Sequence, residues 1–387
     1  MFRREFVEAV EQAGVQPAEG SNVPRGRKLW IYIFVALGVS VGAIVAISFA
    51  TMDHSTFKAL SRIELLSFVV VIMLVVGRWF GECLRYSLVI KAMGKKLAFK
   101  KTSKAVLGSA FAGTITPFRS GSFPTQVFFF TRYGLTGGEA TAVSVSAGAI
   151  SMLVMMISMP IALIVGASKV HIGMGFRTVL MVAAVILFIA FVFALASMKD
   201  PSRVPRILRK ITPSSIRRKQ KFESFEERLT KGMGDFSGSV RTLLKAKKRI
   251  LVAIVLLTVF FWFTGLFTVC WILRGLGFSQ FFWKALLCQM LVSSILPFTP
   301  VPAESGIAEL AFAGVFSIFI PKSALALVTM SWRFFMFYLP LAGLGVFFIL
   351  AANDSRRIGK EQDKVRLDEM IALPLPMPLV EPLPEEA

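Results

Sequence analysis

The sequence is poor in the residues that build disulfide frameworks and metal sites. It has 3 cysteines and 2 histidines in 387 residues. Cys83, Cys270 and Cys288 all lie in apolar stretches, where we expect them to be buried small hydrophobic residues. His54 and His171 lie far apart in the chain, and no cluster of other ligands accompanies either of them. We therefore predict no metal site and no cofactor.

Charged residues are also scarce, and acidic residues are the scarcer kind. Charged residues make up 17% of the chain and hydrophobic residues 55%, which excludes an ordinary soluble domain and indicates an integral membrane protein. Lys and Arg number 44 against 23 Asp and Glu. These basic residues cluster beside apolar stretches without a nucleic-acid-binding motif, so no nucleic-acid partner is predicted. Their expected partners are anionic membrane lipids.

Six apolar stretches are long enough to cross a bilayer as helices, which takes about 20 residues. They are residues 29–50, 65–90, 138–166, 176–198, 250–273 and 324–350. With both termini in the cytoplasm, the inner segments hold 32 Lys and Arg and the outer segments hold 7, as the positive-inside rule requires. We predict an all-α, polytopic helix bundle in the cytoplasmic membrane of the cell.

Two short polar breaks interrupt apolar regions, one in each half of the chain. Both contain proline, which removes a backbone donor, and glycine, which loosens the backbone. In lipid, non-helical backbone persists only where protein buries it or where it lines a wet cavity. Each break is therefore predicted to be the tip of a re-entrant helical hairpin. The tip residues are Thr116, Pro117, Ser120 and Gly121 in the first break, and Thr299, Pro300, Ser305 and Gly306 in the second.

The predicted hairpins give the two halves of the chain opposite orientations in the membrane. Such an inverted-topology repeat places a binding site near the bilayer midplane, where the hairpin tips meet. The predicted parts are an N-terminal cytoplasmic arm (1–28), a transmembrane domain (29–350) and a Pro-rich cytoplasmic tail (351–387). The transmembrane domain contains repeat one (65–166), a basic cytoplasmic linker (199–249) and repeat two (250–350).

Three arginines are predicted near the middle of the membrane: Arg78, Arg119 and Arg333. Each charge there costs about 2.5–3.5 kcal/mol, so each needs a partner. The candidate carboxylates are Glu82, Glu304 and Glu309. Two interpretations stay open. The charges could be structural ion pairs, or they could form a cationic cavity for a lipid phosphate, which the planar guanidinium suits.

Two further arginines, Arg85 and Arg132, lie near the predicted cytoplasmic edge of the membrane. Long basic side chains at that depth extend toward the headgroups. We expect both of them to snorkel and to lie outside the site.

Three stretches resemble a known family: TPFRSGSFPTQVFFFTRYGLTGGEATA (116–142), LPFTPVPAESGIAELAF (296–312) and WRFFMFYLPLAGLG (332–345). They are similar to the flippase-like family known as the lysylphosphatidylglycerol synthase transmembrane region, the membrane half of the multiple peptide resistance factor. The resemblance implies an eight-segment domain with two re-entrant helices that translocates lipid. By position it points to Pro117, Arg119, Gly121, Pro300, Gly306, Glu309 and Arg333. The chain departs from the family pattern at 145–148 and at 303–304.

We therefore expect a translocase that moves an anionic phospholipid or a lipid-linked phosphate between leaflets. A secondary transporter of a small soluble anion is the alternative. A membrane transferase is less favoured, because the short outer loops offer only Asp53, Glu64 and the histidines as chemical groups. About 37 residues follow position 350, too few for a soluble aminoacyl-transfer domain, so the chain is predicted not to be an enzyme. Homo-oligomerisation is left open.

Overall fold

A computed structural model describes residues 64–169, 245–296 and 299–372 of the chain. It also describes scattered positions within 38–49, 178–189 and 238–242. Every regular element in these residues is a helix, and none of them forms a strand. The expected all-α, polytopic helix bundle is therefore confirmed for the described part of the chain.

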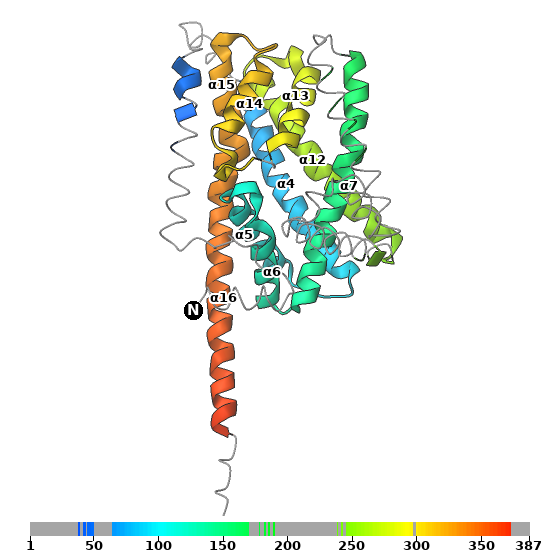
Figure 1. Ribbon diagram of the computed structural model, residues 1–387, viewed down its shortest axis with the longest axis vertical. Helices are drawn as coiled ribbons and strands as arrows, with labels where there is room; N and C mark the ends of the chain where they lie inside the picture. The colour runs from blue at the N-terminus through cyan, green and yellow to red at the C-terminus, as the bar shows by residue number, and fades with distance from the viewer. Residues whose placement is uncertain are drawn as a thin grey trace, which may run out of the picture.

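Helices of very different lengths make up the two halves of the bundle (Figure 1). The first half contains α4 (Leu65–Ala92), α5 (Phe99–Thr114), the short 3₁₀ turn η1 (Pro117–Arg119), α6 (Ser122–Arg132) and α7 (Gly137–Lys169). The second half begins with α12 (Lys248–Gly275), the 3₁₀ turn η2 (Ser279–Phe281), α13 (Phe282–Ile295), the 3₁₀ turn η4 (Pro302–Glu304) and α14 (Ile307–Phe316). It ends with α15 (Lys322–Arg333), the π-helical turn η5 (Phe334–Tyr338) and α16 (Leu339–Ala372).

Four described helices are long and apolar enough to cross a membrane. They are Leu65–Ala92, Gly137–Ile157, Lys248–Gly275 and Lys322–Gly359, and they match four of the six predicted crossings. The other two predicted crossings, 29–50 and 176–198, lie outside the continuously described residues. So do the predicted arm at 1–28 and most of the linker at 199–249.

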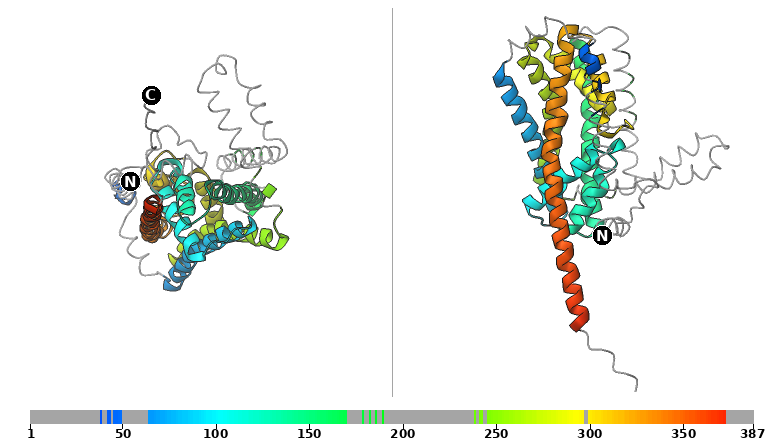
Figure 2. Two further views of the ribbon diagram at one scale, coloured as in Figure 1. Left: turned by 90° about the horizontal axis from the view of Figure 1, so that it is seen from below. Right: turned by 90° about the vertical axis from the view of Figure 1, so that its left-hand side faces the viewer.

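The last helix is longer than the sequence pattern indicates. Helix α16 continues from the bundle to Ala372 and projects beyond the other helices (Figures 1 and 2). Residues 351–372 are therefore helical rather than part of an unpacked tail. Charges of both signs at helical spacing support this extension, as in the contact of Arg357 with Glu361, four residues apart. Beyond Pro340 in its first turn, the next proline, which would end the helix, is Pro374.

Two short helical pairs lie between the long helices. Hairpin one consists of α5, η1 and α6, and hairpin two of α13, η4 and α14. Hairpin one lies in the lower part of the bundle in Figure 1 and hairpin two in the upper part, so their turns approach each other from opposite ends.

Small residues let these helices approach closely. A Cβ at Gly81 of α4 would lie 3.0 Å from the ring of Phe260 on α12. A Cβ at Gly108 of α5 would lie 3.2 Å from the Cα of Phe348 on α16. Close packing of this kind is a main source of helix association in lipid, because apolar side chains gain little by leaving one apolar medium for another.

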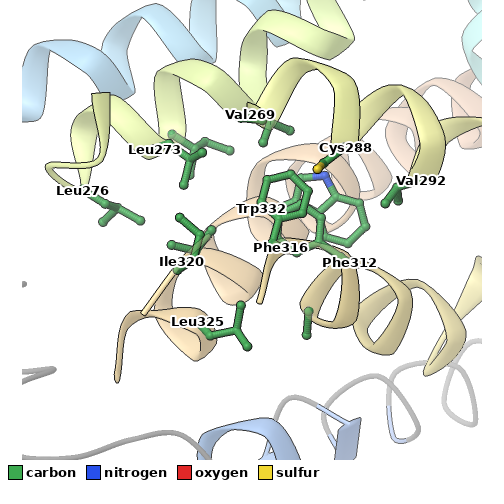
Figure 3. Close-up of a cluster of buried hydrophobic side chains, with 14 of the residues drawn as sticks. Val269, Leu273, Leu276, Cys288, Val292, Phe312, Phe316, Ile320, Leu325 and Trp332 are labelled. Carbon is green, nitrogen blue, oxygen red and sulfur yellow. The ribbon is translucent and has the colours of Figure 1, made fainter. Parts of the chain in front are cut away.

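Two hydrophobic clusters pack the bundle, each centred in one half and joined by residues of the other. The first is built around Phe128, Phe129 and Phe130 of α6, which are almost fully buried. In the second, the ring of Phe312 stacks on Phe316 at 3.9 Å and on Trp332 at 4.2 Å between ring centroids (Figure 3). All three cysteines are free and buried, as the sequence predicts.

Candidate functional site

The two hairpin turns have the same backbone conformation at the two residues after their first proline and differ at the Ser-Gly that ends them. Each begins with proline, continues through two residues of positive φ, and ends in Ser-Gly. The values of φ are 53° and 55° at Phe118 and Arg119, and 59° and 55° at Ala303 and Glu304. Non-glycine residues rarely adopt this left-handed region, at a cost of about 1–2 kcal/mol each. Such strain is commonly found at functional sites.

This conformation corrects the sequence-based correspondence of the two breaks. The turn of hairpin two begins at Pro302 rather than at Pro300, so Pro117 matches Pro302. The Thr299-Pro300 pair instead lies ahead of the turn. Arg119 and Glu304 then occupy the same place in the two turns, with opposite charges.

The two tips, defined as 116–121 and 299–306, are in direct contact. The backbone N–H of Phe118 donates to the carbonyl of Thr299 at 3.2 Å. The Nε of Arg119 lies 3.2 Å from Oε1 of Glu304. Residues about 180 positions apart in the sequence thus meet through one hydrogen bond and one ion pair.

Tip one is held by bonds within its own hairpin. The hydroxyl of Thr116 donates to the carbonyl of Ala112 at 2.9 Å and accepts the N–H of Gly121 at 2.8 Å. A Cβ on Gly121 would lie 2.8 Å from the Ala112 oxygen, so only glycine fits there. Ser120 remains exposed. Thr116 and Gly121 therefore shape the turn rather than offering groups to a ligand.

Tip two is held by a buried carboxylate. Gly306, with φ of 77°, precedes α14, and its N–H donates to Oε2 of Glu309 at 2.8 Å. This contact satisfies a free donor at the helix N-terminus. Ser305 is also buried, and among the described residues its hydroxyl has no hydrogen-bond partner.

Arg333 completes the anchoring of tip two. Its Nε donates to Oε1 of Glu309 and its Nη2 donates to the carbonyl of Ala303, both at 2.7 Å. The guanidinium also lies 4.0 Å from the centre of the Phe337 ring. Arg333 and Glu309 are almost fully buried. The structure therefore pairs these two predicted site residues with each other.

Arg85 differs from its expected role. It does not snorkel, because its side chain is 3% exposed and binds inside the bundle. It donates to both carboxylate oxygens of Glu82, at 2.9 and 2.7 Å, and to the carbonyl of Ala147 on α7 at 2.7 Å. The spacing of three residues from Glu82 was the signal that could have predicted this pair. Arg132 is half-buried, with its guanidinium 5.5 Å from the Phe128 ring centre.

Arg78 has the fewest polar contacts of these arginines. Its guanidinium lies 4.1 Å from the centre of the Phe261 ring and packs against Gly265. Its Nε is buried, with no hydrogen-bond partner among the described residues. Arg78 is close enough to Arg119 and Glu82 to interact electrostatically with both.

Seven charged groups are linked through these contacts and form one neighbourhood around the tips. They are four arginines (78, 85, 119 and 333) and three glutamates (82, 304 and 309), and together they carry a net charge of +1. The surplus lies on the side of Arg78 and Arg119, because Arg85 and Arg333 each have a close carboxylate partner. This arrangement can accept one additional anion.

Comparison with known proteins identifies the family. A family model described as "Lysylphosphatidylglycerol synthase TM region" matches residues 33–343, which is most of the chain. The chain belongs to this family. A UPF0104 membrane protein of Archaeoglobus fulgidus is 24% identical over 310 residues, covering 78% of this chain and 92% of that relative. The resemblance identified from the motifs at 116–142, 296–312 and 332–345 is therefore confirmed.

Membership of the lysylphosphatidylglycerol synthase transmembrane family corrects one expectation. The prediction that the chain is not an enzyme is wrong as stated, because the family is named for a synthase, which is an enzyme. That prediction rested on the small number of residues after position 350. This number bears only on whether a separate soluble domain follows, not on the membrane domain itself. What the family supports is a multi-pass membrane protein with a function related to membrane lipids.

Proposed function

We propose that this protein translocates an anionic or phosphate-bearing lipid between the leaflets of the cytoplasmic membrane. The observation that carries the proposal is the surplus positive charge at the meeting tips of two oppositely directed hairpins. Arg119 is 57% exposed there, and Arg78 beside it has a buried donor without a partner. A lipid phosphate is an anion that arginine binds through paired hydrogen bonds.

In this proposal, hairpins one and two are re-entrant and belong to an inverted-topology repeat. Their arrangement from opposite ends of the bundle supports this assignment (Figure 1). Both termini lie in the cytoplasm in this proposal, which the distribution of Lys and Arg supports. Arg78 and Arg119 bind the headgroup, and Glu304 competes with it. The buried pairs Arg85–Glu82 and Arg333–Glu309 keep the helices in place around the tips.

The test is leaflet exchange in vesicles reconstituted with the purified protein. The vesicles contain phosphatidylcholine and a trace of fluorescently labelled phosphatidylglycerol, and a membrane-impermeant reductant quenches the label in the outer leaflet. We expect the wild type to expose nearly all of the label to quenching, whereas Arg119→Gln leaves the inner-leaflet share protected.

Arg274→Gln is the matched control for this variant. Arg274 also contacts a glutamate through its Nε, at 3.3 Å from Glu64, and is 52% exposed, but it lies away from the tips. We expect this control to behave as the wild type. Equal exchange by Arg119→Gln and wild type contradicts the proposal. Uptake of inorganic phosphate without lipid exchange supports transport of a soluble anion instead.

A further inference from the structure

The ion pair that joins the tips is much weaker in its geometry than the two buried pairs. Arg85 and Arg333 each have a carboxylate and a backbone carbonyl at 2.7 Å, and both are almost fully buried. Arg119 has one contact with Glu304, at 3.2 Å, and remains 57% exposed. The Glu304 side chain is 17% exposed. A pair in which one partner is largely exposed contributes little net stability and exchanges partners readily.

Arg78, beside this weak pair, has a buried donor that could serve an anion. Its buried Nε donor has no hydrogen-bond partner in the described part of the chain, although a buried charged donor normally has one. The nearby charge of Arg119 is unfavourable for Arg78, and Glu82, the favourable charge, is already held by both contacts from Arg85. A second anion beside Arg119 would serve both arginines.

The two tips have strained backbones and few bonds to each other, so little holds them in contact. Arg119 and Glu304 both have φ of 55°, and each is preceded by another non-glycine residue of positive φ. Besides the ion pair, one backbone hydrogen bond, from Phe118 to Thr299, links η1 to the residues ahead of η4. Displacement of Glu304 from Arg119 would therefore leave that bond as the one polar link between the two tips among the residues that the structure describes.

From these contacts we infer that the carboxylate of Glu304 is a built-in substitute for the phosphate of the ligand. It holds Arg119 while the site is empty. A phosphate-bearing anion binds by displacing Glu304 from Arg119, is shared with Arg78, and separates the two tips. This inference rests on the proposed function for the identity of the ligand. It adds that the protein inhibits its own anion site.

Binding measurements with Glu304→Gln test the inference, because the amide keeps the shape of the side chain and removes the competing charge. The probes are phosphatidylglycerol, titrated into protein held in phosphatidylcholine nanodiscs, and inorganic phosphate in the same nanodiscs. We expect phosphatidylglycerol to bind about 2- to 5-fold more tightly to Glu304→Gln than to the wild type, the range expected for loss of one exposed ion pair.

Glu64→Gln is the matched control, since Glu64 makes the similar exposed contact with Arg274 away from the tips. We expect its affinity for both probes to equal that of the wild type. Unchanged or weaker binding by Glu304→Gln, or the same gain in Glu64→Gln, overturns the inference. Tighter binding of phosphatidylglycerol alone identifies a lipid headgroup as the ligand, and tighter binding of both probes identifies the phosphate group itself.

Two variants of Arg119 keep the test decisive if Glu304→Gln is poorly folded, as thermal unfolding of the purified protein would show. Arg119→Lys keeps the charge and is expected to bind phosphatidylglycerol within about 3-fold of the wild type, while Arg119→Gln loses about 10-fold or more. Equal binding by these two variants contradicts the inference. Since binding is measured without transport, the inference can hold even where leaflet exchange is absent.

Discussion

The two hairpin tips share a pair of positive-φ residues after a proline but differ in what surrounds them. At tip one, Phe118, Arg119 and Ser120 are exposed, and the turn is held by Thr116 within its own hairpin. At tip two, Ala303 and Ser305 are buried. There the turn is held by Glu309 of α14 together with Arg333 of α15, which lies outside the hairpin.

This difference assigns different roles to residues of the same type. Arg333 neutralises a buried carboxylate and satisfies the carbonyl of a strained residue, which is a structural role. Arg119 occupies an exposed tip and has one long contact, so it can bind something else. Depth in the membrane predicts the cost of a charge, but the local partners decide whether that charge supports the fold or binds a ligand.

The largest effect that follows from this comparison is loss of the anchor of tip two. Arg333→Ala leaves Glu309 buried opposite an empty space and the carbonyl of Ala303 without its donor. Breaking a buried pair on one side costs about 3–5 kcal/mol. We expect a large fall in the midpoint of thermal unfolding in detergent.

Arg357→Ala is the control for this anchor. Arg357 lies farther along the same continuous helix and makes an exposed contact with Glu361 at 3.9 Å. Its loss should cost no more than about 0.5 kcal/mol. If Arg333→Ala were as stable as Arg357→Ala, Arg333 would not be an anchor, and the contrast between the tips would fail.

Replacing the matched glycines of the two turns with alanine is expected to destabilise the protein less, and for a different reason in each turn. Gly121 has an ordinary φ of −75°, but a Cβ there would lie 2.8–2.9 Å from Ala112 and Thr116. Gly121→Ala should therefore destabilise by overpacking, by about 1–3 kcal/mol. Gly306 has φ of 77°, and Gly306→Ala should cost about 1–2 kcal/mol through backbone strain.

Chemical denaturation of the two glycine variants, with Gly148→Ala beside them, checks this prediction. Gly148 lies in α7, and a Cβ there would have no atom within 4 Å, so alanine should leave stability unchanged or raise it slightly. A change at Gly121 no larger than that at Gly148 would show that tip one can shift to accept a side chain.

Much of the fold follows from simple sequence signals. Apolar length predicted all four described crossing helices, and the Pro and Gly of the two breaks predicted where the short helices end. The length of α16 was missed, since beyond residue 350 its support comes from charges at helical spacing and not from apolar residues. Hydropathy detects only that part of a helix that lies in lipid.

The partners of the charged residues were harder to predict. Glu304 was one of three candidate carboxylates, and the structure places it against Arg119. Arg85 was misjudged because depth along α4 was considered without its neighbour Glu82. The bond from Arg333 to the carbonyl of Ala303 depends on the strained turn at tip two, which residue types alone do not reveal.

Among the charged residues at the tips, a small effect on stability is expected at the residue with the largest expected effect on function. Arg119→Gln removes one exposed contact, which should cost no more than about 1 kcal/mol, against the several expected for Arg333→Ala. Thermal unfolding should thus place Arg119→Gln near the wild type, while the same preparation fails to exchange labelled phosphatidylglycerol. A fall in stability as large as that of Arg333→Ala would contradict the assignment of different roles to the two arginines. Arg119 would then support the fold at tip one as Arg333 does by anchoring tip two.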